Sequence, residues 1–140
     1  MERSVIKDIR EIEMIIGDYI IKSQKYEKYI NHTQMQIILY LIRHEGEDVC
    51  QKDLEIETHL KKASITGTLD SMEDKGIILR KQSEEDKRKN LIYLSEKTLN
   101  EKERIKKRIN EIEEKINNNI SEEELNQFYS VIDKMKANLK

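Results

Sequence analysis

Hydrophobic residues recur at alternating spacings of four and three along the first thirty residues of the chain. This spacing is a heptad seam, which predicts one long helix over residues 4–30. The seam consists of Val5, Ile9, Ile12, Ile16, Tyr19, Ser23, Tyr26 and Ile30. Further isoleucines outside the seam widen the apolar surface, and they are Ile6, Ile15, Ile20 and Ile21. So wide a surface needs the core of its own chain or a second subunit as partner, and the small size of the remaining chain favours a second subunit.

The heptad pattern breaks at residues 31–33, and a second amphipathic helix follows. Thr33 and Gln36 have the spacing of a capping box, so this helix is predicted over residues 34–44. Its inward positions are expected to be Met35, Ile38, Leu39 and Ile42. Gly46 then ends the helix.

Two shorter helices, predicted over residues 51–59 and 62–75, come next with a turn between them. Leu54 is the inward anchor of the first. The second has small or polar residues on one face, and its apolar face is Ile65, Leu69 and Met72. Gly76 follows it as a C′ glycine would.

A hairpin is predicted after Gly76. Two short apolar runs, residues 77–79 and 91–94, flank a charged tip over residues 83–90. Residues 47–50 are short enough to pair with this hairpin as a single strand. A small-faced helix followed by a basic hairpin is the layout of a winged helix-turn-helix. In such a module the helix enters the major groove of DNA, and the wing reaches the backbone or the minor groove.

Long amphipathic helices also form the end of the chain. Ser95 begins a helix predicted to continue to about residue 118, and Ser121 with Glu124 makes a second capping box before the last helix. That helix is lined by Leu125, Phe128, Val131, Ile132, Met135 and Leu139. The predicted fold class is therefore mainly α with a small β-wing. A winged helix-turn-helix lobe over residues 31–95 is flanked by helices over residues 1–30 and 96–140.

Composition supports helices and limits the class of protein. Charged residues make up 39% and hydrophobic residues 36% of the 140 residues, and there is no proline. The formal net charge of −2 does not by itself indicate a polyanion partner, but DNA binding depends on the local field of one face. No apolar run approaches ~18 residues, no signal peptide is recognisable, and Cys50 is the only cysteine. A cytoplasmic protein without a disulfide or a membrane span is expected.

Short motifs occur in a fixed order along nearly the whole chain. They are Thr33-x-x-Gln36, Gln51-x-Asp53-Leu54, Ala63-Ser64-Ile65-Thr66, Leu69-Asp70, Glu73-x-Lys75-Gly76, Arg80, Asp86-x-Arg88 and Leu94-Ser95-Glu96-Lys97. As an ordered set they resemble the MarR (multiple antibiotic resistance regulator) family of winged-helix transcription factors. The resemblance implies a homodimer joined through its end helices, a pseudo-palindromic DNA operator, and a switch operated by a small ligand or by oxidation. The dimerisation residues are then Val5, Ile9, Ile12, Ile16, Phe128 and Ile132.

The expected DNA-binding residues lie on the second helix of the motif and on the wing. Hydroxyls of the helix can donate to phosphates or base edges, and Gly67 allows close approach of the backbone. By resemblance, Arg88 enters the minor groove while Asp86 holds the wing in shape. The alternative is that these groups are solvated side chains, local caps and ordinary surface ion pairs. The full set is Lys61, Lys62, Ser64, Thr66, Gly67, Asp70, Ser71, Arg80, Lys87, Arg88 and Lys89.

Other chemistry finds less support in the sequence. A cleft beside the dimer helices could bind a small-molecule effector through Tyr26, Tyr29, His32 and Arg43, unless these side chains serve only in packing. Cys50 has acidic or apolar neighbours, which favours a buried structural cysteine over a redox sensor. The histidines lack zinc-site spacing and no catalytic constellation is present, so no metal, cofactor or enzymatic activity is expected.

The leading hypothesis is a homodimeric, sequence-specific regulator that represses transcription by binding double-stranded DNA. The alternative is a winged-helix module that pairs with a protein and does not read DNA sequence.

Overall fold

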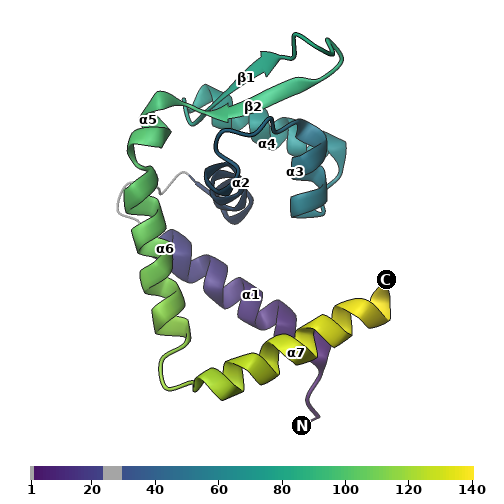
Figure 1. The fold of residues 1–140 in the computed structure, drawn as a ribbon, viewed down its shortest axis with the longest axis vertical. Helices are drawn as coiled ribbons and strands as arrows, with labels where there is room; N and C mark the ends of the chain where they lie inside the picture. The colour runs from purple at the N-terminus through teal and green to yellow at the C-terminus, as the bar shows by residue number, and fades with distance from the viewer. Residues whose placement is uncertain (1, 24–29) are drawn as a thin grey trace. The chain divides into compact units, whose positions relative to one another are not determined.

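The computed structural model of this protein describes residues 2–23 and 30–140 and shows a mainly helical fold with one small antiparallel sheet (Figure 1). Both features of the predicted fold class are confirmed. In chain order the elements are α1 (Val5–Lys22), α2 (His32–Arg43), α3 (Gln51–Thr58), α4 (Lys62–Asp74), β1 (Ile78–Gln82), β2 (Asn90–Leu94), α5 (Glu96–Asn100), α6 (Lys102–Ile116) and α7 (Glu122–Leu139). The chain divides into two compact units between Arg104 and Ile105. No helix in the described ranges is long and apolar enough to cross a membrane.

The first helix ends earlier than its heptad seam predicts. Ser23 is the C-cap of α1, and its hydroxyl donates a 2.9 Å hydrogen bond to the carbonyl of Ile20. A serine that bonds to the preceding turn satisfies a carbonyl that the helix end leaves open. Ile30 lies outside any helix, so the predicted span of residues 4–30 is wrong at its C-terminal end.

The second helix begins two residues before its predicted start. Its N-cap is Asn31, whose side chain accepts a 2.9 Å hydrogen bond from the amide of Gln34. The Gln34 side chain in turn accepts from the Asn31 amide at 3.2 Å, which completes a capping box. The predicted box of Thr33 and Gln36 is therefore wrong. Asparagine is the stronger N-cap residue, and the capping box that it forms lies two residues upstream of the predicted one.

The core of the first unit gathers around α2, which contacts α1, α3, α4 and β2. A helix with partners on several sides buries more than one stripe, so Ile37 and Leu41 are buried while the predicted core residue Leu39 is only half-buried. The other predicted anchors of α2, α3 and α4 are buried as expected, and they are Met35, Ile38, Ile42, Leu54, Ile65, Leu69 and Met72.

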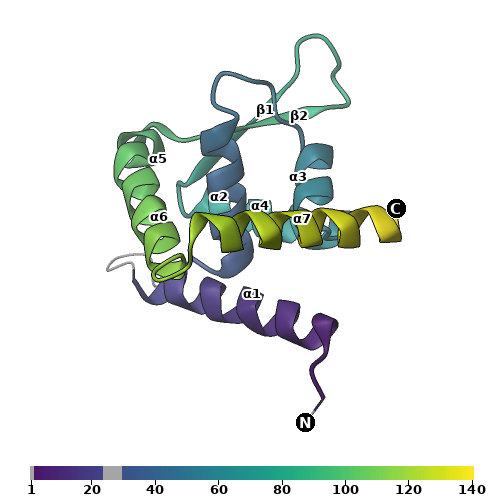
Figure 2. The same ribbon diagram turned by 60° about the horizontal axis from the view of Figure 1, so that its bottom comes forward.

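The wing is a hairpin whose strands pair in antiparallel register from Ile78 opposite Leu94 to Gln82 opposite Asn90. Ile78 and Ile92 point into the core, since their side chains are 0% and 1% exposed. The predicted single strand before α3 is reduced to one bridge between Cys50 and Leu91. The hairpin packs on α2, α3 and α4, and its tip extends beyond them (Figures 1 and 2).

The helix predicted over residues 95–118 is two helices, α5 and α6, separated at Glu101. Hydroxyl groups fasten the start of α5 to the chain just before β1. Ser95 donates to the carbonyl of Gly76 at 2.7 Å, and Thr98 donates to that of Ile77 at 2.9 Å. The spacing of isoleucines could not show such a break.

In the second unit, the capping box predicted for α7 is confirmed. The Ser121 hydroxyl accepts from the amide of Glu124 at 3.0 Å, and Glu124 accepts from the Ser121 amide at 3.0 Å. The hydrogen bond from the Ser121 amide to the Glu124 carboxylate, followed by the interaction of that carboxylate with the Ser121 side chain, lowers the pKa of Glu124 below its ordinary value of 4.5. None of the residues of α7 is buried.

Candidate nucleic-acid interface

The turn between α3 and α4 is built from local hydrogen bonds. His59 has the left-handed backbone conformation, with a φ of 57°, and it caps α3. Thr58 donates its hydroxyl to the carbonyl of Leu54 at 2.7 Å and accepts from the amide of Leu60 at 3.4 Å. The tight turn leaves α4 with Lys61 as its N-cap residue, and the side chain of Lys61 makes no capping hydrogen bond to the amides of the first turn.

The N-terminal half of α4 presents an exposed polar surface opposite its buried stripe. Lys61, Lys62 and Ser64 are exposed, and so is Gly67, around which an added Cβ would meet no atom within 4 Å. Uncapped amides at a helix start favour anions such as phosphate. This surface therefore combines two cationic side chains, the exposed side chain of Ser64, and backbone at Gly67 that no side chain covers.

Two of the residues expected to contact DNA use their hydroxyls inside the protein. Thr66 donates to the carbonyl of Lys62 at 2.9 Å and accepts from the side chain of Gln51 at 2.9 Å. Ser71 accepts from the side chain of Gln34 at 3.3 Å. These contacts fix α4 to α3 and α2, and both residues are half-buried.

Arg80 and Asp70, also expected at the interface, bind each other. The guanidinium of Arg80 donates to Asp70 at 2.6 Å and to Glu73 at 2.9 Å, and its backbone amide donates to Glu73 at 3.3 Å. The hydrogen bond to the side chain of Glu73, followed by that to Asp70, raises the pKa of Arg80. The hydrogen bond from Arg80 is also the main cause that holds the pKa of Glu73 below its ordinary value of 4.5. The result is a bridge from β1 to α4 in which one cation binds two carboxylates, which leaves a formal charge of −1.

The wing tip is shaped by Asp86. Its carboxylate accepts from the backbone amide of Arg88 at 3.0 Å and from the Arg88 side chain at 3.3 Å, as in an Asx turn. The tip is closed further by Ser83, whose amide donates to Lys89 and whose hydroxyl accepts from the Asp86 amide. Arg88 remains 92% exposed. An arginine held at its base and free at its end can reach into a groove.

Of the expected effector-binding residues, the structure describes only His32 and Arg43. Tyr26 and Tyr29 lie outside the described residues. His32 begins α2 and Arg43 ends it, which puts them about 16 Å apart along the helix axis. His32 lies against α1, with its Nε2 3.1 Å from Asp18, whereas Arg43 pairs with Glu57 at 3.1 Å.

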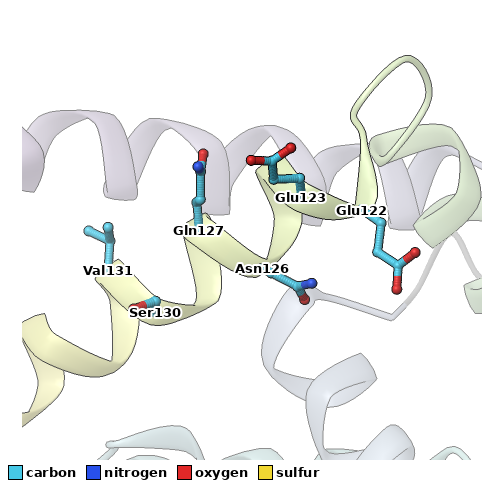
Figure 3. Close-up of a pocket in the computed structure, with 6 residues that line it drawn as sticks. All are labelled: Glu122, Glu123, Asn126, Gln127, Ser130 and Val131. Atoms are coloured by element: carbon cyan, nitrogen blue, oxygen red, sulfur yellow. The ribbon is translucent and has the colours of Figure 1, made fainter.

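A hollow in the second unit involves none of these residues. It is an open depression lined along α7 by Glu122, Glu123, Asn126, Gln127, Ser130 and Val131 (Figure 3). Within the described residues, no group of three or more histidine, cysteine, aspartate or glutamate side chains could hold a metal ion. Cys50 is half-buried, and its thiol donates to Asp53 at 3.3 Å.

The residues expected to join two subunits are largely uncovered in the single chain. Val5 is 55%, Ile9 44% and Ile12 49% exposed, and on α7 Phe128 is 56% exposed. Ile16 and Ile132 are half-buried. Apolar surface on this scale along two helices is unusual for a chain that remains alone in water.

Comparisons with known proteins agree with this architecture. Residues 30–89 match the model of the MarR family. The helix-turn-helix regulator YdgJ of Bacillus subtilis is 23% identical over 138 residues, which cover 99% of this chain and 80% of that protein. The crystal structure of the transcription regulator MarR from Oenococcus oeni has 26% identity and a TM-score of 0.72, over 95% of this chain and 96% of that chain. S. aureus MepR in complex with DNA has 22% identity and a TM-score of 0.86, over 98% of this chain and 99% of that chain.

The helix-turn-helix and its hairpin define a winged-helix protein. Residues 30–89 match the MarR family model, and the chain has the fold of the winged-helix transcription regulators of that family. These relatives are regulators of transcription rather than enzymes.

The sequence did not point to three polar side chains that hold α4 in place, namely Gln34, Gln51 and Glu73. Gln51 and Glu73 stand in the motifs that carry the family resemblance, and this was the one signal available for them. Their partners lie on other elements, so helical spacing carries no information about these contacts.

Proposed function

We propose that this protein is a homodimeric, sequence-specific DNA-binding regulator that represses transcription from a pseudo-palindromic operator. The observation that carries the proposal is the pairing of two exposed cationic features in one lobe. They are the uncapped start of α4, with Lys61, Lys62 and Ser64, and the wing tip, with Arg88 held by Asp86. A helix start of this kind suits a major groove, and an exposed wing arginine suits a minor groove.

Support for the DNA partner also comes from the similarity to MepR, which was solved in complex with DNA. In this proposal the remaining expected contacts are made by Gly67, Lys87 and Lys89, which are all exposed. Asp70, Ser71, Thr66 and Arg80 then act chiefly by holding α4 and the wing, because their polar groups are bound within the protein. The protein would work in the cytoplasm, where it meets the operator.

The dimer follows from the uncovered apolar residues of α1 and α7. Two recognition helices that read half-sites one duplex turn apart must be held about 34–36 Å from each other, which a single lobe cannot do. Sedimentation of the intact chain at micromolar concentration tests this part. A concentration-dependent dimer that Ile12→Glu or Phe128→Glu weakens supports it, and a folded monomer at all concentrations refutes it.

DNA binding is tested by electrophoretic shift assays with the DNA upstream of the gene and with the same DNA in scrambled order. Preference for the upstream DNA is expected, together with a steep loss of affinity as salt rises. Equal affinity for both DNAs would refute sequence-specific binding. Reporter transcription with and without the protein then distinguishes repression from activation.

A small-molecule effector that relieves repression is the last part of the proposal and rests on the family resemblance. Addition of candidate small molecules to the complex with DNA, followed by the shift assay, tests it directly. Release of the DNA at unchanged salt supports relief by a ligand, and persistence of the complex with every compound counts against it.

A second candidate function is a module that binds a protein instead of DNA. The exposed outer face of α4 favours it, because Asp70 and Asp74 lie there and the net charge of the chain is −2. Aspartates near a phosphate backbone repel it, although the Arg80 bridge offsets the charge of Asp70. A scan of sequence preference separates the two functions, since only the regulator selects particular DNA.

A further inference from the structure

Gln34 is a buried polar residue in the otherwise apolar inner face of α2. Its side chain is 2% exposed, and each of its polar groups has a partner. The side-chain carbonyl accepts from the Asn31 amide at 3.2 Å and from the Lys75 ammonium at 3.4 Å. The side-chain amide donates to the Ser71 hydroxyl at 3.3 Å. Burying an amide is unfavourable unless it is hydrogen-bonded, so this site depends on all of these contacts.

The two partners, Ser71 on α4 and Lys75 at its C-cap, lie on one flank of that helix. Ser71 and Lys75 are four residues apart, and Ser64 is seven residues before Ser71, so all three follow one stripe. On the opposite flank Arg80 binds Glu73. The recognition helix is therefore held by polar contacts on both sides, while its apolar stripe rests on the core.

The buried apolar stripe sets the approximate orientation of α4, and hydrogen bonds, which are directional, restrict its rotation about its own axis more closely. Side-chain ends lie about 5–6 Å from a helix axis, so a rotation of roughly 20° moves them by about 2 Å. Such a movement exceeds the tolerance of a hydrogen bond to a base edge. It would still leave flexible lysines within reach of phosphates.

We propose that Gln34 is a positioning residue for DNA sequence recognition, which sets the rotation of α4 through Ser71 and Lys75 and thereby aims Ser64 at the bases. This inference rests on the proposed DNA-binding function. It assigns to a residue buried in α2, away from the DNA, a share of the discrimination between DNA sequences.

Two substitutions at Gln34 separate rotation of α4 from general stability. Gln34→Leu keeps the approximate shape and removes every side-chain hydrogen bond. Gln34→Glu can still accept from the Asn31 amide and the Ser71 hydroxyl, and it can pair with Lys75. Gln36→Leu is the matched control, because exposed Gln36 on the same helix bonds to the carbonyl of Glu57 on α3 and not to α4.

The measurement is the ratio of affinities for the best DNA site and for the same site with one base pair changed in each half, at fixed salt. Gln34→Leu is expected to lower this ratio by about tenfold, within the range that one good base contact contributes. Affinity for unrelated DNA and its salt dependence stay unchanged, because the phosphate contacts remain. Gln34→Glu restores most of the ratio, and Gln36→Leu leaves it at the wild-type value.

Ser71→Ala tests whether the effect passes through Ser71. Because it removes a hydroxyl from a half-buried position, it keeps the test available if Gln34→Leu fails to fold. The single change is expected to lower the ratio, and combination with Gln34→Leu should add little, since both interrupt one contact. Full additivity would mean that Ser71 contacts DNA on its own, which would overturn the proposal.

Other results also decide the matter. If Gln34→Leu and Ser71→Ala lower the melting temperature while the ratio stays at its wild-type value, Gln34 is only a structural residue and the inference is wrong. If the wild-type protein prefers no DNA site over another, the proposed regulatory function fails first, and this inference fails with it.

Discussion

Arg80 on strand β1 donates a 2.6 Å hydrogen bond to Asp70 on helix α4, although both residues were expected to contact DNA. The same guanidinium binds Glu73 one turn further along the helix. The wing is thus joined to the recognition helix by a cation with two carboxylates, and the Arg80 side chain is only 23% exposed. These contacts restrain the angle between β1 and α4.

The first prediction concerns the stability of this bridge. Arg80→Gln should lower the free energy of unfolding near neutral pH, because it leaves two carboxylates facing each other. Glu73 has a lowered pKa in the folded protein, so its contribution is present above 4.5 and disappears as the pH falls through that lowered value. The difference between wild type and variant should therefore shrink in acid, as measured by urea unfolding at about pH 7 and about pH 3.

A change of Asp74 to Asn provides the control for Arg80→Gln. Asp74 is an exposed carboxylate on the same helix and is not bonded to Arg80, so its removal should alter stability little at either pH. An Arg80→Gln variant as stable as the wild type near neutral pH would show that the bridge does not hold the wing.

The second prediction concerns Arg88, which is expected to contribute to DNA binding and not, like Arg80, to stability. Arg88→Ala should weaken binding to DNA of every sequence and reduce the dependence of log affinity on log salt by about one unit per lobe. The melting temperature should hardly change, because the Arg88 side chain is 92% exposed and surface ion pairs contribute about 0–1 kcal/mol. Titration of DNA at several salt concentrations provides the measurement.

Arg3→Ala is the matched control for Arg88→Ala. Arg3 is also exposed, at 87%, and also pairs with a nearby aspartate, Asp8. The Arg3→Ala change removes the same charge as Arg88→Ala, but from the N-terminal end of the chain, next to α1. If both changes weaken DNA binding equally, net charge alone would explain the effect and the wing would have no special part in it.

The elements of the fold could be predicted because each has a local signal. Gly76 is an example, since it ends α4 with a φ of 73° and completes a Schellman motif. In that motif the Ile77 amide bonds to the Met72 carbonyl and the Gly76 amide to the Glu73 carbonyl, both at 2.9 Å. The end of α1 and the break between α5 and α6 were not predictable, because a periodic pattern reveals neither the hydrogen bond from Ser23 to the Ile20 carbonyl nor the interruption at Glu101.

Exposed cations and a glycine on α4 could likewise be found from the order of motifs. The contacts of Thr66, Ser71 and Arg80 could not, since each depends on a partner from another helix or strand. A polar residue on the exposed side of a helix reads the same in sequence whether it meets DNA or a neighbouring element. Only the positions of Gln51, Gln34 and Glu73 in the structure distinguish a side chain that is bound within the protein from one that is available to DNA.

The third prediction uses two glycines with opposite requirements. Gly67 has ordinary helical geometry with open space around it, so Gly67→Ala should stabilise the fold by about 1 kcal/mol through helix propensity. Gly76 has a φ of 73°, so Gly76→Ala should destabilise it by about 1 kcal/mol. Thermal unfolding measures both changes.

Gly67→Ala also tests close approach of α4 to DNA. Gly67→Ala should weaken DNA binding even though the protein is more stable, since a methyl group then stands where the helix backbone nears the groove. Unchanged affinity in the stabilised variant would contradict a close approach at Gly67 and place the contact elsewhere on α4.

The fourth prediction concerns the contact between α1 and α2. The ring of His32 lies so close to the backbone of α1 that an added Cβ on Gly17 would be 2.8 Å from its Nδ1. Gly17→Ala must therefore push the ring away from Asp18, which lies 3.1 Å from its Nε2, and this loss offsets the gain in helix propensity. In a His32→Ala background the same change meets no ring and should stabilise the protein by about 1 kcal/mol. Urea unfolding of the two single variants and the double variant measures the coupling between the residues. Equal stabilisation by Gly17→Ala in both backgrounds would show that His32 does not pack against α1.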